Sequence, residues 1–111
     1  MGTYLVVVMT NPRDGMEEEY LDHYEHTHLD DVLATTPFSS AQLFRLEEQR
    51  GANAAHGFMA VYETEADSAE DAIAQLEARR DERVQSPSIN RRDAALWVFS
   101  PNGERHVRPP G

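Results

Sequence analysis

Three histidines and two tyrosines fall within residues 20–29, in a chain that holds five histidines and four tyrosines. Imidazole titrates near neutral pH, so a histidine in this segment could accept or donate a proton. On an α-helix, with about 100° of rotation per residue, Tyr20, Tyr24 and His28 share one face, and Asp31 follows on the same stripe. The spacing predicts acid–base chemistry, in which His28 moves a proton, Tyr24 positions or polarises a substrate oxygen and Asp31 holds the imidazole tautomer.

The histidines also fit structural roles. His28 could be a buried histidine that hydrogen-bonds the backbone near a helix end. His23 and His26 are predicted on a different, solvated face, where Asp22 stands four residues before His26 and could pair with it. Because His28 is predicted to point away from the other two, we expect no metal site, and we expect no cofactor.

Aromatic and polar side chains elsewhere are candidate substrate contacts. A tyrosine hydroxyl can hydrogen-bond a substrate oxygen, although a strand tyrosine more often belongs to the core with its hydroxyl at the edge. Arg45 would attract a carboxylate or phenolate if it faced inward, and the alternative is a solvent-facing arginine. The candidate substrate-binding residues are Tyr4, Tyr20, Gln42, Phe44, Tyr62 and Trp97.

The composition indicates one acidic globular domain. The 111 residues are 40% hydrophobic and 27% charged, which suits a single core near the size where dimerisation commonly adds burial. We expect residues 1–103 to form the domain and residues 104–111 a C-terminal tail. The formal net charge of −10 argues against binding nucleic acid or an anionic membrane surface. All ten basic residues are arginine, and several cluster late in the chain: Arg79, Arg80, Arg83, Arg91 and Arg92.

The chain contains no cysteine, which excludes disulfides, thiolate metal sites and cysteine nucleophiles. The apolar run at residues 5–9 has strand length and no basic segment before it, so it does not fit a signal peptide. No stretch approaches the length of a transmembrane helix. We therefore expect a cytoplasmic protein without membrane contact.

The hydrophobic periodicity predicts four strands and two helices. Residues 3–10 are apolar and β-branched, as in a central strand covered on both faces. Further strands are predicted at residues 40–48, 56–64 and 94–100. The first helix is predicted to open at a capping box of Asp14 and Glu17 and to run to about Leu33. The second opens at Ser68 with Asp71, and its apolar stripe is Ala69, Ala72, Ile73, Leu76 and Val84.

The resulting order, β-α-β-β-α-β, is that of the ferredoxin-like plait, an α+β fold with two helices on one face of a four-stranded antiparallel sheet. The other face would carry Phe44, one of Met59 and Phe58, and one of Trp97 and Phe99. The helices of this topology cannot cover that face. An apolar sheet face should meet a second copy, and such pairing gives a dimeric α/β barrel.

A segment of the first predicted helix resembles the EthD-like branch of the dimeric α/β-barrel superfamily. The resemblance is carried by His23-Tyr-Glu-His-Thr-His-Leu-Asp-Asp-Val-Leu-Ala34, then by Pro37-Phe38 and Ser40-Ala-Gln42. On this match His28 takes the position of the histidine in the family's Glu-His pair. The resemblance implies a homodimer with a pocket between the sheet and the first helix, which in many relatives acts on aromatic or polyketide-like molecules.

Such relatives include cofactor-independent quinol-forming monooxygenases, muconolactone-type isomerases, polyketide cyclases and haem-degrading proteins, and fold alone does not choose among them. The preferred hypothesis is a cofactor-independent isomerase, cyclase or lyase that acts on an aromatic, lactone or polyketide-like small molecule. One alternative is a cofactor-independent monooxygenase, in which the same base deprotonates a phenol. Another is a non-catalytic small-molecule binding or stress-associated accessory protein. Haem binding, with His28 as axial ligand, is the least favoured.

Overall fold

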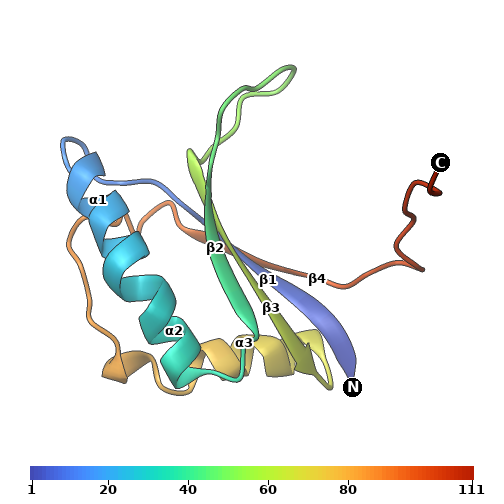
Figure 1. Ribbon diagram of the computed structural model, residues 1–111. Helices are drawn as coiled ribbons and strands as arrows, with labels where there is room; N and C mark the ends of the chain where they lie inside the picture. Colours follow the sequence, from blue (N-terminus) through green and yellow to red (C-terminus); the bar gives the residue numbers. More distant parts are fainter.

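The computed structural model describes residues 1–111 and has an α+β architecture with one antiparallel sheet (Figure 1). The strand order is β2-β3-β1-β4, which is compatible with a ferredoxin-like plait. The strands are β1 (Gly2–Thr10), β2 (Ser40–Arg45), β3 (Phe58–Ala66) and β4 (Ala95–Phe99).

Two helical segments pack on the same face of this sheet and share one core with it. The first is continuous and consists of α1 (Glu17–His23), the π-helical turn η1 (Tyr24–His28) and α2 (Leu29–Thr35). The second is α3 (Ala69–Glu77), followed by the short 3₁₀ turn η2 (Arg80–Glu82). None of the helices combines the length and the apolar character needed to cross a lipid bilayer.

The π-helical turn η1 reconciles two apolar stripes that are out of phase along the first helix. Tyr20 is buried before it and Tyr24 at its first position, and Leu29 and Val32 are buried after it. Tyr24 and Leu29 are five residues apart, which in an uninterrupted α-helix would rotate them by about 140° relative to each other. A turn with i→i+5 hydrogen bonds absorbs one extra residue. Both stripes therefore face the sheet.

The start of the first helix differs from the predicted capping box. Met16, not Asp14, is the N-cap, and no side chain caps the helix. The chain enters through a tight turn in which the Met16 N–H donates to the Arg13 carbonyl at 2.9 Å. The glutamates of the first turn still place negative charge at the positive end of the helix dipole.

The start of α3 agrees with the prediction, because the Asp71 N–H donates to the Ser68 hydroxyl at 3.1 Å. The predicted apolar stripe extended too far, however. Val84 lies beyond the end of α3 and its side chain is 58% exposed. The chain leaves the helical register at Ala78, and Val84 comes after η2.

The two faces of the sheet differ in what covers them. Phe58, Ala60 and Tyr62 of β3 alternate inward and are buried under the helices. The strand register places the opposite set on the uncovered side, which we call the open sheet face. Its members are Leu5, Val7, Met9, Gln42, Phe44, Met59, Val61, Trp97 and Phe99.

Beyond β4 the chain forms no helix or strand and is exposed. These last residues, 100–111, extend away from the sheet in Figure 1. The strand β2 is shorter than predicted and ends at Arg45, because residues 46–57 form a long connection to β3.

Candidate functional site

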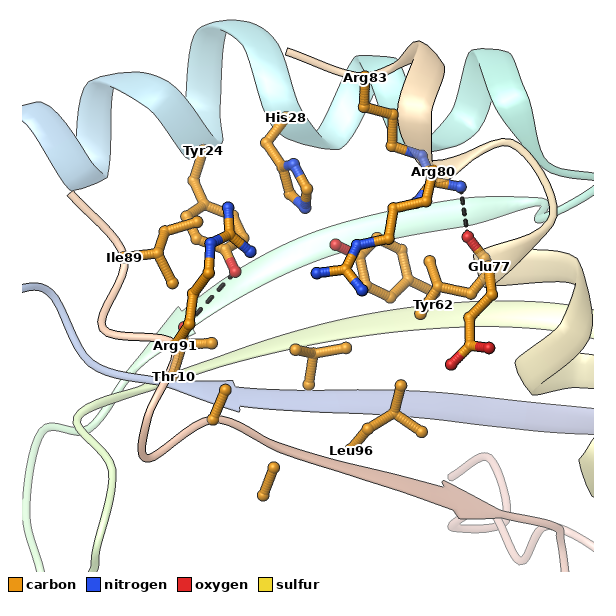
Figure 2. A pocket seen from close by; sticks show the side chains of 14 residues that line it. Thr10, Tyr24, His28, Tyr62, Glu77, Arg80, Arg83, Ile89, Arg91 and Leu96 are labelled. Atoms are coloured by element: carbon orange, nitrogen blue, oxygen red, sulfur yellow. Dashed lines mark hydrogen bonds between the residues drawn. The ribbon is translucent and has the colours of Figure 1, made fainter. Parts of the chain in front are cut away.

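A cavity of about 260 Å³ lies between the first helix, the helix-facing side of the sheet and the segment that follows α3 (Figure 2). Its polar lining comes from Thr10 on β1, Tyr62 on β3, and Tyr24 and His28 on η1. Apolar side chains cover much of the remaining wall: Val8, Leu76, Ile89, Ala94, Ala95 and Leu96. Its charged lining consists of Glu77, Arg80, Arg83 and Arg91.

The π-helical turn determines which side chains meet at this cavity. The ring of His28 is 4.9 Å from that of Tyr24 and 5.4 Å from that of His23, measured between ring centroids. The prediction that His23 is solvated and faces away from His28 is wrong, because i→i+5 spacing brings the two rings to one side. His23 is only 9% exposed, whereas His26 remains at the surface, 3.9 Å from Asp22.

Burial dominates the electrostatics of His28. Desolvation is the largest cause and, together with the neighbouring His23, Arg83 and Arg91, lowers its pKa to about 4, although Asp31 opposes them. The ring is therefore neutral at pH 7. Its Nδ1 atom is buried without a hydrogen-bond partner, as is Nε2 of His23. Because Nδ1 is enclosed, the ring nitrogen available to a ligand is Nε2 of His28, which is not enclosed and makes no hydrogen bond within the chain.

Three phenols lie at or near the cavity, two of them beside Thr10 and two of them in the cavity lining. The Thr10 hydroxyl is 2.5 Å from the Tyr20 hydroxyl and 3.5 Å from the Tyr24 hydroxyl. The hydroxyl of Tyr62 makes no hydrogen bond within the chain. Burial raises the pKa of Tyr20, Tyr24 and Tyr62, so all three remain protonated at neutral pH. Tyr24 and Tyr62 can therefore donate a hydrogen bond into the cavity.

The arginines of the cavity come from the turn after α3 and from the loop before β4. Arg83 is buried, donating from Nε to the Thr35 hydroxyl at 2.7 Å and from Nη2 to the Leu76 carbonyl at 2.5 Å. The loop that carries Arg91 is fixed to the end of β1, because the Asn90 N–H donates to the Asn11 carbonyl at 2.9 Å. Desolvation lowers the pKa of Arg83, which nevertheless stays charged.

The structure places three of the predicted site residues, His28, Tyr24 and Tyr62, on the wall of one cavity. Asp31 makes no hydrogen bond to His28. Its carboxylate instead accepts the backbone N–H of Val84 at 3.2 Å, so it acts on the imidazole only as a nearby charge.

The other candidate substrate contacts lie outside this cavity. Tyr20 is buried in the core, and Tyr4 packs against that core on the same side of the sheet. Gln42, Phe44 and Trp97 lie on the open sheet face. Phe44 borders a second, shallower hollow of about 450 Å³ beside the β2–β3 connection, which has His56 as its only histidine.

Several cavity residues were not predicted as functional: Thr10, Arg80, Arg83 and Arg91. The sequence shows that these arginines cluster late in the chain. That they line the same cavity as His28 depends on the paths of the turn after α3 and of the loop before β4.

No group of three His, Asp or Glu side chains is arranged to hold a metal ion. No protein-family model, no curated protein and no solved structure matches the chain.

Proposed function

We propose that this protein is a cofactor-independent acid–base enzyme, an isomerase, cyclase or lyase, for an aromatic, lactone or polyketide-like small molecule. The observation that supports this most is the position of His28, a neutral and unpartnered imidazole on the wall of a largely apolar cavity. Two protonated phenols, Tyr24 and Tyr62, line the same cavity. A base and hydrogen-bond donors that line one cavity are what enolisation chemistry needs.

In the proposed reaction His28 removes a proton from a carbon next to a substrate carbonyl. The electron pair of the broken C–H bond moves to the carbonyl oxygen and gives an enolate. Tyr62 and Tyr24 stabilise that oxygen by hydrogen bonds. The proton then returns from the imidazolium to a different atom of the substrate, which completes an isomerisation or sets up ring closure.

The low pKa of His28 makes it a weak base in the empty cavity. Its basicity increases during the proposed reaction. As negative charge develops on the substrate, it stabilises the imidazolium and raises the pKa of His28. The pair of opposite charges forms only along the reaction coordinate. Such an interaction lowers the barrier rather than tightening ground-state binding.

We also propose that two subunits pair through the open sheet face to give a dimeric α/β barrel, as the resemblance to the EthD-like branch implies. Trp97, Phe99 and Phe44 are 50%, 52% and 42% exposed on this face. Apolar side chains of this size gathered on one sheet face are typical of an interface. We further propose a cytoplasmic location, with which a chain that contains no cysteine is compatible.

The proposed function is tested by carbon-bound hydrogen exchange in D₂O. Thermal-shift screening first selects aromatic ketones and lactones that bind, and NMR then follows deuterium incorporation next to the carbonyl. We expect the natural chain to catalyse exchange and His28→Gln to slow it by about 10²–10⁴-fold. Exchange that is unchanged in His28→Gln would contradict the proposal. Oxygen uptake in the same samples would indicate a monooxygenase instead.

A further inference from the structure

The cavity concentrates positive charge in a strongly acidic protein. Acidic residues outnumber arginines by 20 to 10, and yet three arginines line this one space. The arginines that form ion pairs are Arg45, Arg50 and Arg79. None of the three cavity arginines forms one, and Glu77 is the only acidic side chain in the lining. The lining therefore carries three positive charges against one negative charge.

The excess positive charge is not confined to the protein surface, because Arg83 is buried. Its side chain is 7% exposed, and its guanidinium is bonded to neutral groups, the Thr35 hydroxyl and the Leu76 carbonyl. Asp31 is the carboxylate whose charge raises its pKa, and the two side chains do not form an ion pair. A buried cation is normally paired, because taking it out of water is unfavourable. The missing partner would be supplied by an anion in the cavity.

The side chains are oriented for this role. Figure 2 shows Arg80 and Arg91 directed from opposite sides into the space below His28, with Tyr62 beneath Arg80. Arg91 also donates to the Gln85 side chain at 2.7 Å, which holds its position. Guanidinium groups are planar multiple donors that match carboxylates and phenolates. The apolar wall beside them suits a ring.

We propose that the ligand of this cavity is an aromatic anion, a ring that bears a carboxylate or phenolate, whose charge is held by Arg80, Arg83 and Arg91. The inference names the substrate class for the proposed function and rests on it in that respect. It accounts for Arg83, whose buried charge gains a counterion. A negative charge in the cavity that His28 also lines would raise the pKa of this imidazole and strengthen it as a base.

Binding of a matched pair of probes tests the inference. Isothermal titration calorimetry compares 2-naphthoate with 2-naphthamide, which has nearly the same shape and no charge. We expect 2-naphthoate to bind at least about tenfold more tightly, as charged hydrogen bonds to arginine require. In a second arm, absorbance spectra of 4-nitrophenol should show a larger ionised fraction in the presence of the protein, which would reveal that the site also takes a phenolate.

Arginine variants test which side chains cause the preference for 2-naphthoate over 2-naphthamide. Arg80→Gln and Arg91→Gln, combined, should remove most of the preference for the anion, whereas Arg92→Gln should keep it. Arg92 is the matched control, because it is the adjacent exposed arginine, carries the same charge and does not line the cavity. Arg83 is left in place because it also bonds to the core.

The inference would be overturned if 2-naphthoate failed to bind, if the amide bound as tightly, or if Arg92→Gln weakened binding as much as the double variant. These outcomes are independent of the acid–base proposal. Arginine-dependent binding together with full hydrogen exchange in His28→Gln would retain the anion site and refute the mechanism. Equal binding of both probes, together with hydrogen exchange that requires His28, would refute the anion site and retain the mechanism.

Discussion

At position 28 the imidazole lies against two other rings, those of His23 and Tyr24, and faces a cavity whose charged groups are mostly arginines. His23, Arg83 and Arg91 disfavour a positive charge on this ring, Asp31 favours one, and partial burial removes water that would solvate it. The same environment keeps the surrounding phenols protonated. The chemistry available to the site therefore follows from desolvation, which favours neutral forms of both kinds of side chain.

The suppressed protonation of His28 predicts how stability depends on pH. The unfolded chain takes up a proton at His28 near pH 6.5, whereas the folded chain takes it up only near pH 4. The stabilisation is therefore complete above pH 6.5 and is lost as the pH falls toward 4. We expect the free energy of unfolding, measured with urea, to drop between pH 7 and pH 4.5 by about 2–3 kcal/mol more in the natural chain than in His28→Gln.

A matched control for this titration is His26→Gln, because that side chain is at the surface. It should keep the pH dependence of the natural chain. If the free energy of unfolding varied with pH in the same way in the natural chain and in His28→Gln, the proposed shift in the pKa of His28 would be refuted.

Arg83 should contribute to stability as well as to binding. Removing its guanidinium leaves the Leu76 carbonyl and the Thr35 hydroxyl without their donors. We expect Arg83→Ala to lower the free energy of unfolding by about 2–3 kcal/mol in urea denaturation. The exposed Arg80→Ala should change it by less than about 0.5 kcal/mol. Equal effects of the two substitutions would contradict the structural role of Arg83.

Among the elements, the π-helical turn has the largest influence on the site. It keeps Leu29 and Val32 in the core and, through the same extra residue, brings His28 beside His23. Turns of this kind are often found at functional sites, where they present a side chain that a regular helix would direct elsewhere.

Deleting Thr27 tests the turn directly. The deletion removes the extra residue, so Tyr24 and Leu29 become four apart and a regular α-helix can bury both. We expect the variant to stay folded, with an unfolding free energy within about 1 kcal/mol of the natural chain, and to lose His28-dependent exchange activity. Deleting Asp30 is the control, because it forces Leu29 or Val32 out of the core and should destabilise by about 1.5–3 kcal/mol.

Much of the element pattern could be predicted from the sequence, because strand alternation and the Ser68 cap are local properties. Phe58, Ala60 and Tyr62 share one face of β3, as alternation requires, but alternation leaves open whether Phe58 or Met59 faces the core, and the structure buries Phe58. The π-helical turn could not be recognised from a regular 100° periodicity, and this error placed His23 in solvent. Arg80 and Arg91 reach the site through turns and loops, whose paths depend on tertiary contacts such as that between Asn90 and Asn11.

In the whole molecule, the two faces of the sheet have different surroundings. Its covered side holds the core and the cavity, and its open face presents large apolar side chains, including Trp97 and Phe99, whose rings are 6.5 Å apart. Pairing through that face would leave the cavity of each subunit on the helix side.

The proposed homodimer predicts a specific effect of Trp97→Glu. A carboxylate at the centre of the interface would be buried without a partner. We expect sedimentation equilibrium to show a dimer for the natural chain and a dissociation constant raised at least about 30-fold, or about 2 kcal/mol, in the variant. Val107→Glu in the exposed tail should leave the dimer intact. A monomeric natural chain would refute the pairing.

The most direct test of the central claim is an NMR titration of ¹⁵N-histidine-labelled protein, with His28 assigned by comparison with His28→Gln. We expect His28 to titrate near pH 4 in the free protein, because it is partly buried at the cavity wall. We also expect saturating 2-naphthoate to move this pKa upward, because the bound anion stabilises the imidazolium. A ring that titrates near 6.5 and does not respond to 2-naphthoate would refute the proposed role of His28.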